Sequence, residues 1–521
     1  MSIRVWGSVS GLPVVSRFLF ILVAVLASAG VRGAAQDAPA GASPSTIVAP
    51  VGFTIAHRPV STSNADAQDA FDDGLTLLYA FDPEQARVSF RRAIELDPQL
   101  AIAWWGVAMS YGTNINTAYD PAAQRSGRDA IAKARALEAA HASASERALI
   151  DAADVRFSFV RPDEADRSAH RYRDAMYRAA AAFQADDDVQ TLAAEAEMDA
   201  HPWDYFTPDG TPTDGTPAIV SRLQTVLARD PAHLGAEHYL IHALEESQHP
   251  EGALPAAERL AAAHFEPAAE HLTHMPAHTF MRVGMYHEAG MANVRAVAAC
   301  DAYVAGTPAG HANYRGHDCA FGIDAFMMAG EYARARALAA TCDGGHGFAL
   351  IDLRFARYDA LAKDVNGTSL SDGMLALHDG RAAAAARALA QLRTEHDDVA
   401  VLSADMLAAA IAERRGDETA AIAALAHATG VQNREGYSEP PEFAFPMGEK
   451  LGAAYYRAGR FGDAERAFRD TLERNRDDPR ALFGLARTLE REGRTADAAA
   501  VDARFATAWR QADTQLDMKD L

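Results

Sequence analysis

The feature that most constrains this chain is a spacing of small and aromatic residues that recurs near both of its ends. Counted from residue 67, positions 8, 20, 24, 27 and 32 are Gly74, Ala86, Phe90, Ala93 and Pro98. Small residues at such positions let two helices approach closely, and a proline ends the second helix. The spacing therefore predicts a helix–turn–helix unit of about 34 residues. Such a unit cannot bury its apolar face alone, so further copies must stack against it.

The same spacing returns near the other end of the chain. Counted from residue 445, positions 8, 11, 15, 20 and 24 are Gly452, Tyr455, Gly459, Ala464 and Phe468. A degenerate copy follows with Leu482, Leu489, Gly493 and Ala498. Both ends resemble the tetratricopeptide repeat, or TPR, and weaker matches begin near residues 234, 270 and 316. Because no long stretch alternates with a strand period, we predict an all-α solenoid of TPR-like helical hairpins with a C-terminal TPR pair.

The first 33 residues have the composition of an export signal. Arg4 and Arg17 flank a compact apolar run over residues 18–29, and small residues follow it. This run is shorter than the roughly 20 apolar residues of a membrane-spanning helix, so we expect cleavage; an uncleaved anchor is the alternative. Ala, Pro and Ser dominate residues 34–60, which predicts a disordered linker. The predicted organisation is a signal peptide over 1–33, a linker over 34–60, a solenoid over 61–435 and C-terminal repeats over 436–521.

Charge and cysteine content limit which classes of partner and which cellular compartment are consistent with the sequence. Without residues 1–33 the formal net charge changes from -22 to -25, because that stretch holds three arginines and no acids. A surface this acidic argues against a nucleic acid partner. The export signal predicts a periplasmic or secreted protein with no membrane span after cleavage. Cys300, Cys319 and Cys342 are too few for a disulfide framework, and either buried thiols or a single bridge is consistent with the sequence.

Histidines are concentrated in two neighbouring stretches at helical spacing. The first stretch carries His238, His242 and Glu245, and the second carries His271, His274 and His278. At 3.6 residues per turn, the members of each trio fall within about 60° of one helix face. The sequence therefore predicts two helices that each present several imidazoles to one side.

Longer stretches extend the resemblance beyond the generic repeat. Residues 103–116, 194–206, 238–245 and 271–284 resemble a family of exported bacterial TPR proteins of unassigned biochemistry. In that family's pattern two further histidines follow, with an asparagine directly after the first. Here His317 matches the first histidine, Asp318 replaces the asparagine and Ala320 replaces the second histidine. In TPR folds, positions 2, 5, 9 and 12 of each unit line a concave groove. The resemblance implies that these positions include His238, His242, Glu245, His271, His274, His278, His317 and Asp324.

Imidazoles from two adjacent hairpins are expected to meet at one point in this groove, because the first helices of neighbouring repeats pack about 8–10 Å apart. Neutral histidine is the commonest metal ligand in proteins, and histidine with carboxylate suits zinc, iron, copper or nickel. We therefore predict a divalent transition-metal site built from His238, His242, Glu245, His271, His274, His278 and His317. Glu195 and Asp324 are further candidate ligands. A hydrogen-bond network among these side chains, without metal, is the alternative.

Three functions remain consistent with the sequence. The first is an exported binding protein with a metal in its groove, and the second is a scaffold that binds a protein or peptide without metal. The third is a metal-dependent enzyme that uses the histidine cluster. Residues 238–278 contain no H-E-x-x-H motif, and the chain shows no phosphate loop, dinucleotide fingerprint or nucleophile elbow. We favour the first function and leave catalysis open.

Overall fold

The computed structural model describes residues 56–159, 164–207, 210–265, 269–306, 314–342, 347–364 and 367–521. All of them fall within one compact unit. The predicted signal peptide over 1–33 and the predicted linker as far as residue 55 lie outside the described residues.

The described residues fold into helices joined by turns and loops, with an isolated antiparallel bridge between Phe206 and Pro212. The first part of the chain contains α1 (Ala65–Tyr79), α2 (Pro83–Leu96), α3 (Ala101–Met109), α4 (Pro121–His141), α5 (Ala144–Arg156), α6 (Ala165–Ala182), α7 (Asp187–Ala200), α8 (Thr216–Arg229), α9 (Leu234–Leu244), η2 (Pro250–Ala253), α10 (Leu254–Ala262), α11 (Glu270–His274) and α12 (Pro276–Arg282). The second part contains α13 (Tyr286–Gly306), α14 (Arg315–Ala329), α15 (Tyr332–Thr341), α16 (Phe348–Arg354), α17 (Tyr358–Leu361), α18 (Ser369–His378), α19 (Ala382–Leu392), α20 (Asp398–Arg414), α21 (Glu418–Gln432), α22 (Met447–Arg457), α23 (Phe461–Arg474), α24 (Pro479–Arg491) and α25 (Thr495–Ala508).

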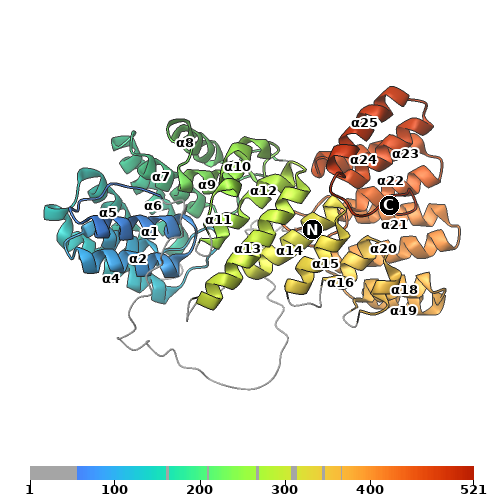
Figure 1. Ribbon diagram of the computed structural model, residues 1–521, viewed down its shortest axis with the longest axis horizontal. Helices are drawn as coiled ribbons and strands as arrows, with labels where there is room; N and C mark the ends of the chain where they lie inside the picture. Colours follow the sequence, from blue (N-terminus) through green and yellow to red (C-terminus); the bar gives the residue numbers. More distant parts are fainter. Residues whose placement is uncertain are drawn as a thin grey trace, which may run out of the picture. The chain divides into compact units, whose positions relative to one another are not determined.

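Consecutive helices contact one another and form a series of helical hairpins (Figure 1). The predicted all-α solenoid of TPR-like hairpins is confirmed. None of the helices in the described ranges combines the length and the apolar character that crossing a bilayer requires.

A phenylalanine held between two glycines explains the repeat spacing at both ends. A Cβ atom added to Gly74 in α1 would lie 2.7 Å from the Phe90 ring, and one added to Gly106 in α3 would lie 2.5 Å from it. The C-terminal pair repeats this arrangement, because a Cβ atom added to Gly452 or to Gly484 would also clash with the ring of Phe468. Real Cβ contacts are not this short, so helices of neighbouring hairpins approach as closely as they do only because these glycines lack side chains.

The turn between the two helices of a hairpin also follows the repeat frame. Gly330 and Gly459 occupy position 15 of their units and have φ values of 79° and 71°. Residues with a Cβ rarely adopt this left-handed conformation, so glycine ends the first helix and lets the chain reverse. The frame deduced from the sequence is therefore the frame of the structure at these two turns.

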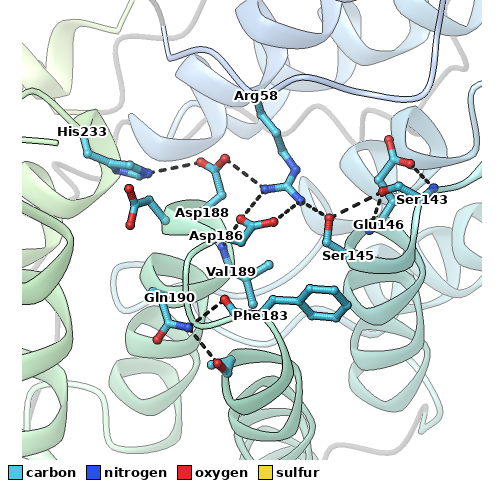
Figure 2. Close-up of polar contacts among 12 residues, drawn as sticks. Arg58, Ser143, Ser145, Glu146, Phe183, Asp186, Asp188, Val189, Gln190 and His233 are labelled. Atoms are coloured by element: carbon cyan, nitrogen blue, oxygen red, sulfur yellow. Dashed lines mark hydrogen bonds and ion pairs between the residues drawn. The ribbon is translucent and has the colours of Figure 1, made fainter. Parts of the chain in front are cut away.

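The N-terminal segment is fixed to helices far along the chain (Figure 2). The Arg58 guanidinium, which is 4 % exposed, donates to Asp186 at 2.7 and 2.9 Å and to Asp188 at 3.0 Å. Asp188 also accepts from the Tyr79 hydroxyl at 2.7 Å and lies 3.3 Å from His233, the N-cap of α9. Residue 58 was predicted to belong to the linker; in the structure its charge is buried among acids, so it is packed. These contacts hold the end of α1 against α9.

The C-terminal repeats contact helices near the middle of the chain. The Tyr286 hydroxyl of α13 donates to the carbonyl of Arg476 at 2.8 Å, and the Arg354 guanidinium donates to both carboxylate oxygens of Glu449 at 2.7 and 2.8 Å. Arg354 and Glu449 are each about 1 % exposed at their side chains. The two segments that the sequence divided at residue 436 are therefore joined by buried polar contacts.

Candidate metal centre

Three successive first helices carry the predicted histidines. His238 and His242 lie on α9, with Glu245 as its C-cap; His271 and His274 lie on α11, His278 on α12 and His317 on α14. Pro276 begins α12 one residue after the C-cap of α11, where a proline costs no hydrogen bond, so α11 and α12 follow each other nearly continuously. His317 is partly exposed, and the other five histidines are buried.

The first group of three ring nitrogens joins α9 to α11. Ligand atoms of His238, His242 and His271 all lie within 4.8 Å of one another. The three side chains belong to residues that are 0, 2 and 3 % exposed. Nδ1 of His238 is 2.5 Å from the carbonyl oxygen of Tyr79, so this nitrogen carries the proton and donates, and Nε2 is left as a bare lone pair. Both ring nitrogens of His242 and of His271 lack a hydrogen-bond partner.

The second group joins α11 and α12 to α14. Nε2 of His274 is 2.9 Å from Nε2 of His278 and 3.1 Å from Nε2 of His317. Two ligands at 2.0–2.1 Å from a tetrahedral metal are about 3.3 Å apart, so these separations are close to those of a chelating set. The three ligand atoms also lie within 4.8 Å of one another.

The histidines form two centres, whereas the sequence interpretation placed them at one. The helix α11–α12 lies between α9 and α14, as the ring contacts on both sides show, so its imidazoles are divided between two neighbours. His271 turns toward α9, and His274 and His278 turn toward His317. Spacing along one helix defines a face, but it does not say which neighbour each side chain will meet.

Glu245 lies between the two groups and is a member of neither. Its Oε2 is 3.4 Å from Nδ1 of His242 and 3.1 Å from Nδ1 of His278. Glu439 also reaches the second group, with Oε2 accepting from Nδ1 of His278 at 3.0 Å. Burial raises the pKa of Glu245 to about 7 and also raises the pKa of Glu439. Carboxylates that contact the far side of a histidine ligand orient its ring and increase its basicity, and Glu245 and Glu439 are placed to act in this way on His278.

Burial keeps most of these imidazoles neutral. It lowers the pKa of His238, His242, His271 and His274 well below the usual value, and the neighbouring histidines lower it further. The pKa of His317 falls to about 3 for the same reasons. Burial also acts to lower the pKa of His278, but the Glu245 and Glu439 carboxylates outweigh it and raise the value. The neutral imidazole is the form that binds a metal.

Aromatic side chains cover the first group. Tyr314 stacks on His271 with ring centroids 4.2 Å apart, Phe81 lies 4.6 Å from His238, and Trp203 meets His242 edge-on at 5.4 Å. The sequence interpretation placed these histidines in a groove that a ligand could enter. In the structure the rings are enclosed by these aromatic groups, which excludes bulk water from the first group.

Other candidate residues do not join either group. Glu195 on α7 lies 3.9 Å from the Arg156 guanidinium, and Asp324 is buried on α14. Among the cysteines, Cys319 and Cys342 form a disulfide and Cys300 is a buried free thiol, so the single-bridge interpretation is the one found.

Three neighbours of the histidines were not singled out as ligand partners from the sequence. Asn293 on α13 places Oδ1 at 2.7 Å from Nδ1 of His274, and Asp318 lies 3.3 Å from the same nitrogen. Asp318 was noted only as a departure from the family pattern. Glu439 lies just beyond the predicted boundary between the solenoid, which ends at residue 435, and the C-terminal repeats. A polar residue at mid-helix, such as Asn293 among alanines, is the one signal that would have indicated a partner.

Comparisons with known proteins identify the repeat at one end of the chain. Residues 450–513 match the model of the tetratricopeptide repeat. A search of curated proteins found no match. Among solved structures, the P58(IPK) TPR domain is 13 % identical, covers 82 % of this chain and 99 % of its own, and has a TM-score of 0.21. Yeast Tom70 is 10 % identical, covers 88 % and 94 %, and has a TM-score of 0.27. These TM-scores are too low to show that the helices of this chain are arranged as in either structure. Residues 450–513 are thus tetratricopeptide repeats, as their spacing predicts.

Proposed function

We propose that this chain is an exported TPR binding protein whose buried histidines hold a divalent transition metal. The observation that carries the proposal is the first group of ring nitrogens. Five nitrogens of His238, His242 and His271 are buried and form no hydrogen bond, and of these only Nδ1 of His242 has a carboxylate nearby, Oε2 of Glu245 at 3.4 Å. Leaving one such group unsatisfied costs about 1–3 kcal/mol, and five in one place would be a large cost for a site with no ligand. A cation that accepts three of their lone pairs offsets much of that cost.

The donor set narrows the class of metal. Three neutral imidazoles suit zinc, copper, iron or nickel, whereas calcium and magnesium prefer oxygen ligands. A metal held by three protein ligands keeps a coordination position for water or a small ligand. The proposal therefore concerns a transition metal bound by nitrogen.

Elemental analysis of the mature protein tests this proposal. The protein should be made without an affinity tag, because a histidine tag binds the same ions. We expect at least one divalent transition metal per chain after growth in supplemented medium. The double variant His242→Ala with His274→Ala should lose metal and keep its helical content by circular dichroism. A metal content near zero in the unaltered protein would contradict the proposal.

Export is supported by the disulfide. A bridge between Cys319 and Cys342 forms and persists in oxidising compartments such as the bacterial periplasm or the extracellular space. Fractionation of cells that produce the full chain is expected to recover it, shortened by its signal, outside the cytoplasm.

A cavity supports the metal-dependent enzyme as the second candidate. It has a volume of about 700 Å³ and is lined by residues that include Gly316, Ala320 and Pro440. These are sequence neighbours of His317 and Glu439, which belong to the second group or contact it. A small molecule in this cavity would lie near His317, which is the partly exposed member of the second group. Metal-dependent turnover of a small-molecule panel, lost in His317→Ala, is the test.

A further inference from the structure

The six histidines of the candidate metal centre divide into two sets of three that adjoin each other. The first set is His238, His242 and His271, and the second is His274, His278 and His317. Between the sets, the ring centroids of His242 and His278 are 5.7 Å apart, and those of His271 and His274 are 5.9 Å apart. These separations are close to the spacing within each set, where centroids lie 4.7–5.9 Å apart.

Proton positions in the second set leave two lone pairs facing each other. The Asn293 side-chain amide donates to the carbonyl of Ala289 at 2.9 Å, so its oxygen faces Nδ1 of His274, which must donate. Nδ1 of His278 faces the carboxylates of Glu245 and Glu439 and donates as well. In the neutral rings both Nε2 atoms are then bare, and they are 2.9 Å apart.

A proton can relieve one such pair but not three converging nitrogens. Nε2 of His317 also points at Nε2 of His274, at 3.1 Å. If His278 donates a proton to Nε2 of His274, the single lone pair of that nitrogen is occupied. Nε2 of His317, which faces the same nitrogen, is then left without a partner there. A metal ion accepts all three lone pairs at once, as it does in the first set.

Glu245 links the sets through one carboxylate. Its Oε2 approaches one histidine of each, His242 at 3.4 Å and His278 at 3.1 Å, in both cases at Nδ1. Nε2 of each ring is then the atom directed at a metal, with the shared carboxylate behind both. Ions in the two sets would therefore be coupled through a common partner as well as by proximity.

We infer that the chain binds two transition-metal ions side by side, one in each histidine set, with Glu245 as the partner that they share. This inference rests on the proposed function and goes beyond it, since that proposal requires only one ion. Two adjacent ions with open positions can hold one small ligand, such as hydroxide, between them.

Zinc stoichiometry in single-set variants is the first test. Metal-free full-length mature protein is titrated with Zn²⁺ and analysed for bound metal after desalting. We expect two ions per chain in the unaltered protein, one in His238→Ala, one in His317→Ala and none tightly held in the double variant. His249→Ala is the matched control, because this histidine is 83 % exposed at its side chain and belongs to neither set; it should bind two ions.

Electron paramagnetic resonance of the Cu²⁺-loaded protein is the second test, and it uses the unaltered chain. Two adjacent Cu²⁺ ions should give a spectrum broadened or silenced by their interaction, and either single-set variant should give the spectrum of one isolated ion. A single ion in the unaltered protein, or two ions without interaction, would overturn this inference and leave the proposed function standing. No bound metal would overturn both. If an alanine variant unfolds, the glutamine variant at the same position replaces it.

Discussion

At the scale of single residues, the group that faces Nδ1 decides which ring nitrogen is free in His238, His274 and His278. A carbonyl faces His238, an amide oxygen faces His274 and two carboxylates face His278. Each of these partners directs Nε2 toward the other imidazoles. These three rings are thus oriented by residues outside the two histidine groups.

Asn293 offers a direct test of this role. Asn293→Ala removes the acceptor for Nδ1 of His274, so the ring is free to turn and to change tautomer. Metal affinity should fall about 10- to 100-fold, as measured by competition with a chromogenic chelator, because loss of a partner behind a histidine ligand has effects of this size. Asn433→Ala is the control, since that residue is exposed, and its affinity should not change. Equal affinity in both variants would show that Asn293 does not orient the ring.

The candidate residues could be named from the sequence, but their grouping could not. Helical spacing placed His238, His242, His271, His274 and His278 on common faces, and the structure brings all of them together with His317. The division into two sets depends on which neighbour each ring meets, and that is decided by packing across hairpins. Asn293 and Glu439 come from other helices or segments, 19 and 161 residues from the rings they contact. No local pattern links residues so far apart.

At the scale of helices and hairpins, glycine at position 8 of a unit allows close packing around a phenylalanine. Gly452→Ala would force a methyl group to within 2.6 Å of the Phe468 ring. Overpacking of this kind should lower the free energy of unfolding by about 1–3 kcal/mol, measured by urea denaturation.

Gly462→Ala is the matched control for this substitution in the same hairpin. No atom lies within 4 Å of the Cβ that it would add, and the residue is in the first turn of α23. Alanine there should leave the free energy of unfolding unchanged or raise it by up to about 1 kcal/mol. If both variants were equally stable, the repeat spacing would not reflect packing.

The disulfide joins α14 to the end of α15, in a hairpin near the middle of the chain. Cys319 and Cys342 are 23 residues apart, and a bridge closing a loop of this size stabilises by about 3 kcal/mol, chiefly by restricting the unfolded chain. Replacing both cysteines by alanine should lower the free energy of unfolding by about that amount in urea. Cys300→Ala, which removes a thiol without a bridge, should cost clearly less.

The helical class and repeat frame were predictable at this scale because both are local. Glycine at positions 8 and 15 follows from helix approach and from turn conformation within about 34 residues. The contact between α1 and α9 was not predictable, since it joins units that are not neighbours and depends on Arg58, Tyr79 and Asp188.

At the scale of the whole molecule, the buried pair of Arg354 and Glu449 joins the central helices to the C-terminal repeats. Burial alone would raise the pKa of Glu449, but Arg354 and Arg480 lower it to about 2. A carboxyl group whose pKa is lowered by folding stabilises fully above its unfolded value and loses that contribution as pH falls. The contribution of Glu449 should therefore be complete above about pH 4.5 and disappear as pH approaches 2.

Comparison with Glu449→Gln isolates this contribution from that of other acids. At pH 7 the variant should be less stable by about 3–5 kcal/mol, because it leaves Arg354 buried without its charged partner. The difference between the two proteins, measured by urea denaturation at several pH values, should shrink between pH 4.5 and 2. A difference that stays constant over this range would show that the pair does not titrate as described.

The position of Glu439 in the sequence affects when the surroundings of His278 can be completed during synthesis. The carboxylate that completes the surroundings of His278 lies 161 residues further along the chain, beyond the end of the predicted solenoid. During synthesis, all six imidazoles leave the ribosome long before it does. Under the proposed function, the complete surroundings of the metal would form only after residue 439 has been made. A fragment ending at residue 435 would carry all six histidines but would lack the Glu439 carboxylate.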